Sequence, residues 1–226
     1  MTTAAEDRVL VLLRHAQAED PFSGGPDIAR ELTEGGVADA EAAGRWLHDL
    51  GIGIDEVLCS ASVRTQQTAE AIWAGGCSEA DVRIDKRLYN ASAEAILDVI
   101  READEDANVV MVIAHAPGLP ALASLLADGD GSVDAHEALG HGFPTTGIAL
   151  LSFSGHWRDL SPDAAVLDRF HVARAWALGG LTTGGEPRHT PCVCRPLGGR
   201  GWAPVADGET IRACLNCVLG PRPTAG

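Results

Sequence analysis

The sequence predicts an α/β fold, a three-layer α/β/α sandwich around a mainly parallel central sheet. Short apolar runs at 8–14, 55–60, 108–114 and 146–154 have the length and composition of buried strands. Helical segments follow several of these runs, and such alternation is typical of a parallel sheet with helices on both faces. The chain of 226 residues is long enough for one domain with an appendage.

The predicted helices carry boundary signals. Thr33 and Glu34 stand ahead of an alanine-rich helix that ends at Gly51, and a long glycine- and proline-rich loop at 20–36 leads into it. Ser92 is suited to cap a later helix. The other expected elements are helices at 62–76, 92–106 and 118–129, a short strand within 81–89, and a small glycine-rich loop from there to Pro144.

Charge and hydropathy exclude several classes of partner. The net charge is −15, with 32 acidic against 17 basic residues, which argues against broad binding to nucleic acid or anionic membranes. No run of 18 apolar residues is present, and the N-terminus lacks the basic and apolar regions of a secretory signal. We therefore expect a cytoplasmic protein without a membrane span, and the sequence leaves its oligomeric state open.

The composition changes near residue 176. Residues 176–226 are rich in glycine and proline and show little periodicity, so we expect a domain over 1–175 and a poorly ordered C-terminal extension. Four cysteines crowd this extension: Cys192, Cys194, Cys214 and Cys217. They could supply four thiolates to a zinc ion, or they could lie in an extension without function, and both interpretations stay open.

Basic and imidazole side chains follow the ends of the predicted strands. Arg14 and His15 follow the first strand, Arg64 lies one turn into the helix after the second, and His115 follows the strand at 108–114. Ligands of open parallel sheets bind at the carboxyl ends of the strands, so we expect these four side chains to converge. Arginine suits phosphate oxygens, and histidine is a nucleophile towards phosphorus.

The neighbours of these residues have simpler interpretations. Ser60 is expected to cap the helix that carries Arg64, and Thr65 and Thr68 to pack that helix. Cys59 is expected to be a small buried strand residue and not a nucleophile.

Three segments resemble the motifs of the histidine phosphatase superfamily, also called phosphoglycerate-mutase-like. LRHAQ contains its Arg-His pair, SASVRTQQTAE its Ser-x-x-x-Arg-Thr pattern, and IAHAPG its second histidine. The segment GFPTTGIALLSF and the short chain look more like the phosphohistidine phosphatase (SixA-like) branch. The resemblance covers about residues 8–175 and makes 1–175 the expected histidine phosphatase domain.

The resemblance implies a role for each of the four side chains. His15 would attack a phosphoryl group and carry it as phosphohistidine, while Arg14, Arg64 and His115 would bind its oxygens. Water would then release phosphate, with neither metal nor cofactor in the reaction. The substrate would be a phosphorylated protein or a small phosphate compound.

The general acid is where the chain departs from the family. Members that act on alcohol phosphates usually place a glutamate between the second arginine and the second histidine. Here Tyr89, Asn90 and Ser92 stand in that region, and the nearest downstream carboxylate, Glu94, falls in a helical first turn, where acids are commonly structural. A missing acid favours a substrate whose leaving group departs easily, such as phosphohistidine on a protein or another activated phosphate.

Two alternatives remain open from the sequence. One is a general phosphomonoesterase or nucleotide phosphatase that uses Glu94 as acid, and the other is a catalytically silent, phosphate-binding regulatory module. A mutase is disfavoured, because the expected short connection up to Pro144 offers no lid to retain an intermediate.

Overall fold

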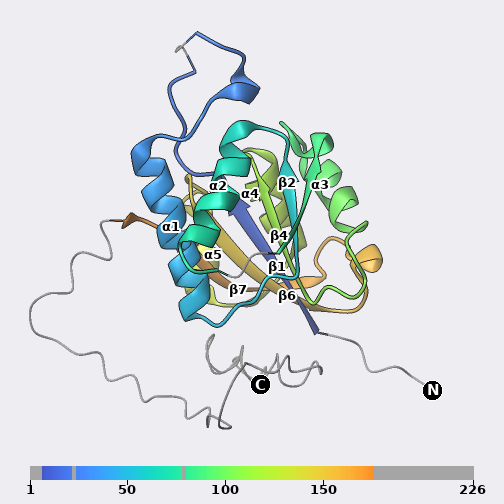
Figure 1. Ribbon diagram of the computed structural model, residues 1–226. Coiled ribbons are helices and arrows are strands. Elements are labelled where there is room, and N and C mark those ends of the chain that lie inside the picture. Colours follow the sequence, from blue (N-terminus) through green and yellow to red (C-terminus); the bar gives the residue numbers. More distant parts are fainter. Residues whose placement is uncertain (1–6, 22–23, 78–79, 176–226) are drawn as a thin grey trace, which may run out of the picture.

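A seven-stranded sheet forms the centre of the computed structural model, which describes residues 7–21, 24–77 and 80–175 (Figure 1). Across the sheet the strands follow the order β3-β2-β4-β1-β6-β7-β5. Their bounds are β1 (Asp7–Arg14), β2 (Glu56–Ser60), β3 (Asp81–Asp85), β4 (Val109–Ala114), β5 (Ala127–Gly131), β6 (Gly147–Ser154) and β7 (Ala165–Val172). The strand that ends in Arg14 therefore lies in the middle of the sheet.

Most neighbouring strands are parallel, which confirms the predicted sheet type. β1 runs parallel to β4, β4 to β2, β2 to β3, and β5 to β7. Only β6 is antiparallel to its described neighbours, β1 and β7. We call the side where Arg14, Ser60 and Ala114 end β1, β2 and β4 the carboxyl edge, and the opposite side the amino edge.

Helices cover both faces of the sheet, so the three-layer sandwich is confirmed. Residues of α1 and α2 pack with Val9, Val11 and Leu13 on one face, and those of α3 and α4 pack with Leu10 and Leu12 on the other. The bounds are α1 (Glu34–Asp49), α2 (Val63–Ala74), α3 (Ala93–Ile100), α4 (Gly118–Leu126) and α5 (Val133–Gly140), with the 3-10 turns η1 (Asp27–Ala29), η2 (Lys86–Leu88) and η3 (Trp157–Asp159).

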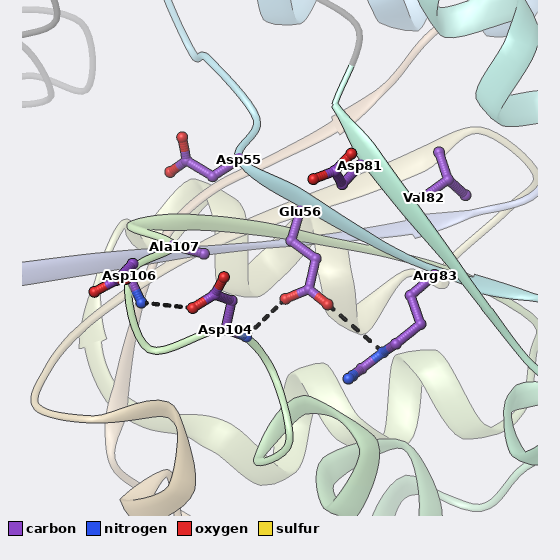
Figure 2. Close-up of a pocket in the computed structure, with 8 residues that line it drawn as sticks. All are labelled: Asp55, Glu56, Asp81, Val82, Arg83, Asp104, Asp106 and Ala107. Carbon is purple, nitrogen blue, oxygen red and sulfur yellow. Dashed lines mark hydrogen bonds and ion pairs between the residues drawn. The ribbon is translucent and has the colours of Figure 1, made fainter.

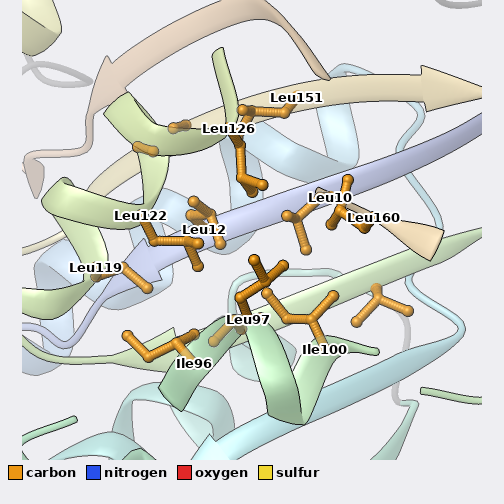
Figure 3. Packing of buried hydrophobic residues seen from close by; sticks show 14 of the residues in the cluster. Leu10, Leu12, Ile96, Leu97, Ile100, Leu119, Leu122, Leu126, Leu151 and Leu160 are labelled. Carbon is orange, nitrogen blue, oxygen red and sulfur yellow. The ribbon is translucent and has the colours of Figure 1, made fainter. Parts of the chain in front are cut away.

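The core holds β1 rigidly from both sides. Figure 3 shows Leu10 and Leu12 of β1 among aliphatic side chains from α3 and α4, including Ile96, Leu97 and Leu122. The two leucines are fully buried, and each contributes about 1.5–3 kcal/mol relative to an exposed side chain. The residues that follow the carboxyl end of β1 are consequently attached to a rigid, fully packed strand.

The helix caps follow the sequence signals. Thr33 accepts a hydrogen bond from the backbone N–H of Gly36, and Ser92 accepts one from Ala95 at the start of α3. α3 ends at Ile100, earlier than the predicted 92–106, and α4 ends at Leu126.

The connection before Pro144 differs from the prediction. In place of a small glycine-rich loop, it contains β5 and α5, and β7 further along was not foreseen either. The β5 sequence ADGDG has no apolar alternation, so the strand arises from its pairing with β7 rather than from a local preference. β5 and α5 extend the sandwich beyond β7.

Some expectations fall outside the described residues. The C-terminal extension and its cysteines Cys192, Cys194, Cys214 and Cys217 are among them. In the described part of the chain, no helix combines the length and apolar character needed to cross a membrane.

Candidate active site

The four predicted side chains meet at the carboxyl edge. Arg14 pairs in register with Ala114 of the parallel strand β4, so His15 and His115 leave adjacent strands side by side. The centroids of their two rings lie 5.1 Å apart. Arg64, in the first turn of α2, places a guanidinium nitrogen, Nη2, 3.4 Å from Nδ1 of His115.

His15 is held in the form that a nucleophile requires. Its Nδ1 lies 2.7 Å from the carbonyl oxygen of Ala16. A carbonyl only accepts, so Nδ1 carries the proton and Nε2 keeps its lone pair. Burial, together with the nearby Arg64 and Arg14, lowers the pKa of His15 to about 4, so the ring is neutral at pH 7.

The backbone around His15 is fixed by two threonines. The N–H of Ala16 donates to Oγ1 of Thr68 at 3.1 Å, and that hydroxyl donates to the carbonyl of Arg64. On the other side, the N–H of Thr146 lies 3.1 Å from the carbonyl oxygen of Arg14. Thr68 thus does more than pack its helix, and Thr146 is a supporting residue that the sequence analysis missed.

Both arginines have one buried donor that no described residue pairs. Nε of Arg14 and Nε of Arg64 are buried and have no hydrogen-bond partner within the described chain. Some of their other nitrogens are anchored: Nη1 of Arg14 donates to the carbonyl of Phe143 at 2.8 Å, and Nη1 and Nη2 of Arg64 donate to Asp27. Burial lowers the pKa of Arg14, but a guanidinium stays charged at neutral pH. Buried charged donors are normally paired, so these two atoms fit an oxyanion.

Ser60 binds His115, so the predicted helix cap is wrong. Oγ of Ser60 lies 2.8 Å from Nε2 of His115, and the N-cap of α2 is Ser62 instead. Arg64 can only donate to Nδ1, so Nε2 carries the proton given to Ser60. Burial, with His15 and Arg64 nearby, lowers the pKa of His115 to about 3. Ser60 is buried at the end of β2. A serine at this position of the sequence can either cap the following helix or bind a histidine ring, and the sequence does not distinguish the two roles.

Asp27 also reaches the site, although no motif in the sequence points to it. From the turn η1, its carboxylate accepts Nη2 of Arg64 at 3.0 Å, the Tyr89 hydroxyl at 2.6 Å and Nε of Arg30 at 2.9 Å. These donors, led by Tyr89, hold the pKa of Asp27 far below its usual range. A loop with no periodicity gave no sign that it folds back onto Arg64.

Glu94 and Cys59 complete the predicted set. Glu94 lies exposed in the first turn of α3, where a backbone hydrogen bond and Ser92 lower its pKa. The loop before α3 passes so close to the helix after His115 that a Cβ on Gly118 would lie 2.0 Å from the carbonyl oxygen of Ala91.

Cys59 is buried, and burial raises its pKa to about 12, which suits the predicted inert strand residue.

A cavity of about 440 Å³ lies elsewhere, at the amino edge (Figure 2). Three of the acidic side chains that line it accept backbone N–H groups: Asp55, Glu56 and Asp104. Asp55 accepts two backbone N–H groups, and Glu56 accepts the N–H of Asp104 and lies 3.5 Å from Nε of Arg83. Among the described residues, no group of three or more histidine, cysteine or acidic side chains is placed to hold a metal ion.

Comparisons with known proteins agree on one family. Residues 10–94 match the model of the histidine phosphatase superfamily, branch 1. An uncharacterized protein of Mycobacterium tuberculosis is 36% identical over 163 residues, which cover 72% of this chain and all of the relative.

Two solved structures have a similar fold and are described as the "putative phosphohistidine phosphatase SixA" of their organisms. The one from Nakamurella multipartitia is 34% identical with a TM-score of 0.66, over 76% of this chain and 99% of that one. The one from Agrobacterium tumefaciens is 30% identical with a TM-score of 0.58, over 73% and 97%. The chain therefore belongs to the histidine phosphatase superfamily, as an enzyme of the phosphatase or mutase type.

Proposed function

We propose that the protein is a phosphatase that works through a covalent phosphohistidine at His15 and acts on phosphohistidine of a protein. Two buried Nε atoms, of Arg14 and Arg64, lie beside a neutral His15 without a hydrogen-bond partner among the described residues, and they carry this proposal. They form a place for phosphoryl oxygens next to a free lone pair, which is the arrangement that in-line phosphoryl transfer needs.

Each step follows from these atoms. The Nε2 lone pair of His15 attacks phosphorus while the bond to the leaving nitrogen breaks, and that nitrogen takes a proton from solvent. Arg14 and Arg64 offset the charge on the phosphoryl oxygens. A dianion beside His115 would favour a proton on its Nδ1, which then donates to an oxygen. Water attacks phosphorus next, the bond to Nε2 breaks, and inorganic phosphate leaves.

The choice of substrate rests on the state of the carboxyl groups. Asp27, the carboxylate bound to Arg64, has its pKa held far below the usual range, so it has no proton to give at pH 7. The pKa of Glu94 is also lowered, and a general acid needs the opposite shift. An alkoxide needs a proton donor, whereas the imidazole nitrogen of phosphohistidine departs more easily. The similarity to two proteins that are each described as a "putative phosphohistidine phosphatase SixA" supports the same class.

The test is competition in one sample. Phosphorus NMR would follow a phosphohistidine-bearing protein and p-nitrophenyl phosphate together, with wild type, His15→Ala and, as a control, the exposed histidine variant His141→Ala. We expect wild type and His141→Ala to clear the phosphohistidine signal first, and His15→Ala to clear neither. Hydrolysis of the ester alone would support the phosphomonoesterase alternative and make Glu94→Gln the next variant. No turnover by wild type would support the silent binding module.

A further inference from the structure

Asp27 occupies one edge of the Arg64 guanidinium. The backbone carbonyl of Asp27 accepts Nη1 of Arg64 at 2.7 Å, and its carboxylate accepts Nη2 at 3.0 Å. One residue thus takes the end-on edge of the planar group, formed by the two terminal nitrogens. Asp27 does not use the side edge, which is formed by Nε and the second proton of Nη2.

The side edge faces the reaction site. Nη2 lies 3.4 Å from Nδ1 of His115, and Nε is buried without a partner in the described chain. A change in the side-chain torsion angles of Arg64 would turn Nε away from the site. The contact with Asp27 opposes this change, because both of its acceptors would be lost at once.

Asp27 is itself braced by Arg30, which directly follows its own turn, and by Tyr89, which follows η2. Tyr89 donates its hydroxyl to Oδ2 at 2.6 Å, and Nε and Nη2 of Arg30 reach Oδ1 at 2.9 and 2.8 Å. The Tyr89 ring also lies against the guanidinium of Arg64, with its centroid 5.8 Å from Cζ. The residues in contact with Asp27 come from the loop after His15, from α2 and from the segment after η2. Asp27 therefore links three segments of the chain around the site.

We propose that Asp27 is a positioning residue, which fixes the edge of Arg64 that receives the phosphoryl oxygens. This inference rests on the proposed function, because Arg64 is taken to bind those oxygens. Asp27 does not touch the substrate and gives no proton. It acts only through Arg64.

The direction in which phosphate affinity changes on removal of Asp27 distinguishes a positioning role from simple electrostatic repulsion. A carboxylate near an anion site repels the anion, so its removal should tighten phosphate binding if charge alone matters. If Asp27 positions Arg64, its removal should weaken phosphate binding even though a negative charge is lost.

The experiment measures binding of inorganic phosphate by calorimetry, with thermal unfolding as a check of the fold. We expect Asp27→Ala to weaken binding about tenfold and the near-isosteric Asp27→Asn to weaken it less. Glu31→Ala, a control that removes an exposed charge from the same loop, should stay within twofold of wild type. In an Arg64→Ala background, Asp27→Ala should not weaken phosphate binding further, because the residue through which it acts is gone.

Two results would overturn the proposal: equal or tighter phosphate binding by both Asp27 variants, or an undiminished effect of Asp27→Ala when Arg64 is absent. The readout is independent of turnover. If wild type binds phosphate but hydrolyses nothing, the proposed function fails while the role of Asp27 is still decided by binding.

Discussion

The carboxyl and amino edges of the sheet are both polar, but their charges are arranged in opposite ways. At the amino edge, carboxylates around a cavity of about 440 Å³ accept backbone N–H groups and face Arg83. At the carboxyl edge, Arg14 and Arg64 are held by their terminal nitrogens while each keeps a buried Nε unpaired among the described residues. Nε of Arg83 is likewise buried without a hydrogen bond in the described chain, but it lies 3.5 Å from a carboxylate oxygen of Glu56. The two edges thus differ in what faces the buried charge and not in the size of a cavity.

Removal of an arginine should have the largest effect, and only at the carboxyl edge. Arg64→Ala is expected to lower kcat about 100- to 1000-fold, because it removes a donor to the transition-state charge. Arg83 is the matched control, since its Nε is also buried but lies 3.5 Å from Glu56. Arg83→Ala should change kcat less than twofold in steady-state assays. A comparable loss of kcat in both variants would contradict the functional difference between the two edges.

The two site histidines should make stability depend on pH. The pKa of His15 is lowered from 6.5 to about 4, and that of His115 to about 3. The unfolded chain therefore binds more protons below pH 6.5, so the free energy of unfolding is greatest above pH 6.5 and falls as the pH drops towards 4. The loss from His15 alone is on the order of 3 kcal/mol.

Urea unfolding of wild type and His15→Asn at a series of pH values measures this loss. The variant should show a smaller decrease between pH 6.5 and 4. Identical curves would mean that His15 titrates normally in the folded protein. In the same range, kcat/KM should keep its plateau to well below pH 6.5, because the free enzyme holds His15 neutral.

Two buried serines allow a finer comparison within the carboxyl edge. Ser60→Ala leaves Nε2 of His115 buried without its partner and should lower kcat about tenfold, at a cost of about 1–3 kcal/mol in stability. Ser62→Ala removes a hydrogen bond to Thr65 and should lower stability without changing kcat. Kinetics and denaturant unfolding of both variants would check this, and equal kcat values would remove the role given to Ser60.

The smallest effect is expected at the amino edge. Asp55 accepts the N–H groups of Asn108 and Val109 at the start of β4. Asp55→Ala should lower the free energy of unfolding by about 1 kcal/mol and leave kcat and KM unchanged. A marked change in KM would show that the acidic cavity takes part in substrate binding.

The carboxyl edge was predictable from the sequence to the extent that its residues follow strands. Arg14, His15 and His115 come directly after apolar runs, and parallel strands bring such residues together. Ser60 was correctly predicted to end a strand, but the predicted helix cap was wrong. Its hydroxyl contacts His115, which follows a different strand, and local sequence does not reveal such a contact.

The features that could not be predicted from the sequence depend on contacts between distant parts of the chain. Asp27 reaches Arg64 from a glycine- and proline-rich loop, and no local pattern indicates where such a loop returns. β5 forms from ADGDG because β7 lies beside it, although those residues alone favour a turn. Thr146 supports the backbone at Arg14 across the sheet, at a separation that spacing cannot reveal.

The most direct measurement is the position of phosphate on the enzyme. Wild type would be mixed with phosphorylated substrate, quenched in alkali within milliseconds, and examined by peptide mapping and phosphorus NMR, which separates the two phosphohistidine isomers. The structure predicts phosphate on Nε2 of His15, because Nδ1 is bound to the carbonyl of Ala16. Phosphate on Nδ1, on His115 or on no histidine at all, while substrate is being hydrolysed, would contradict the account.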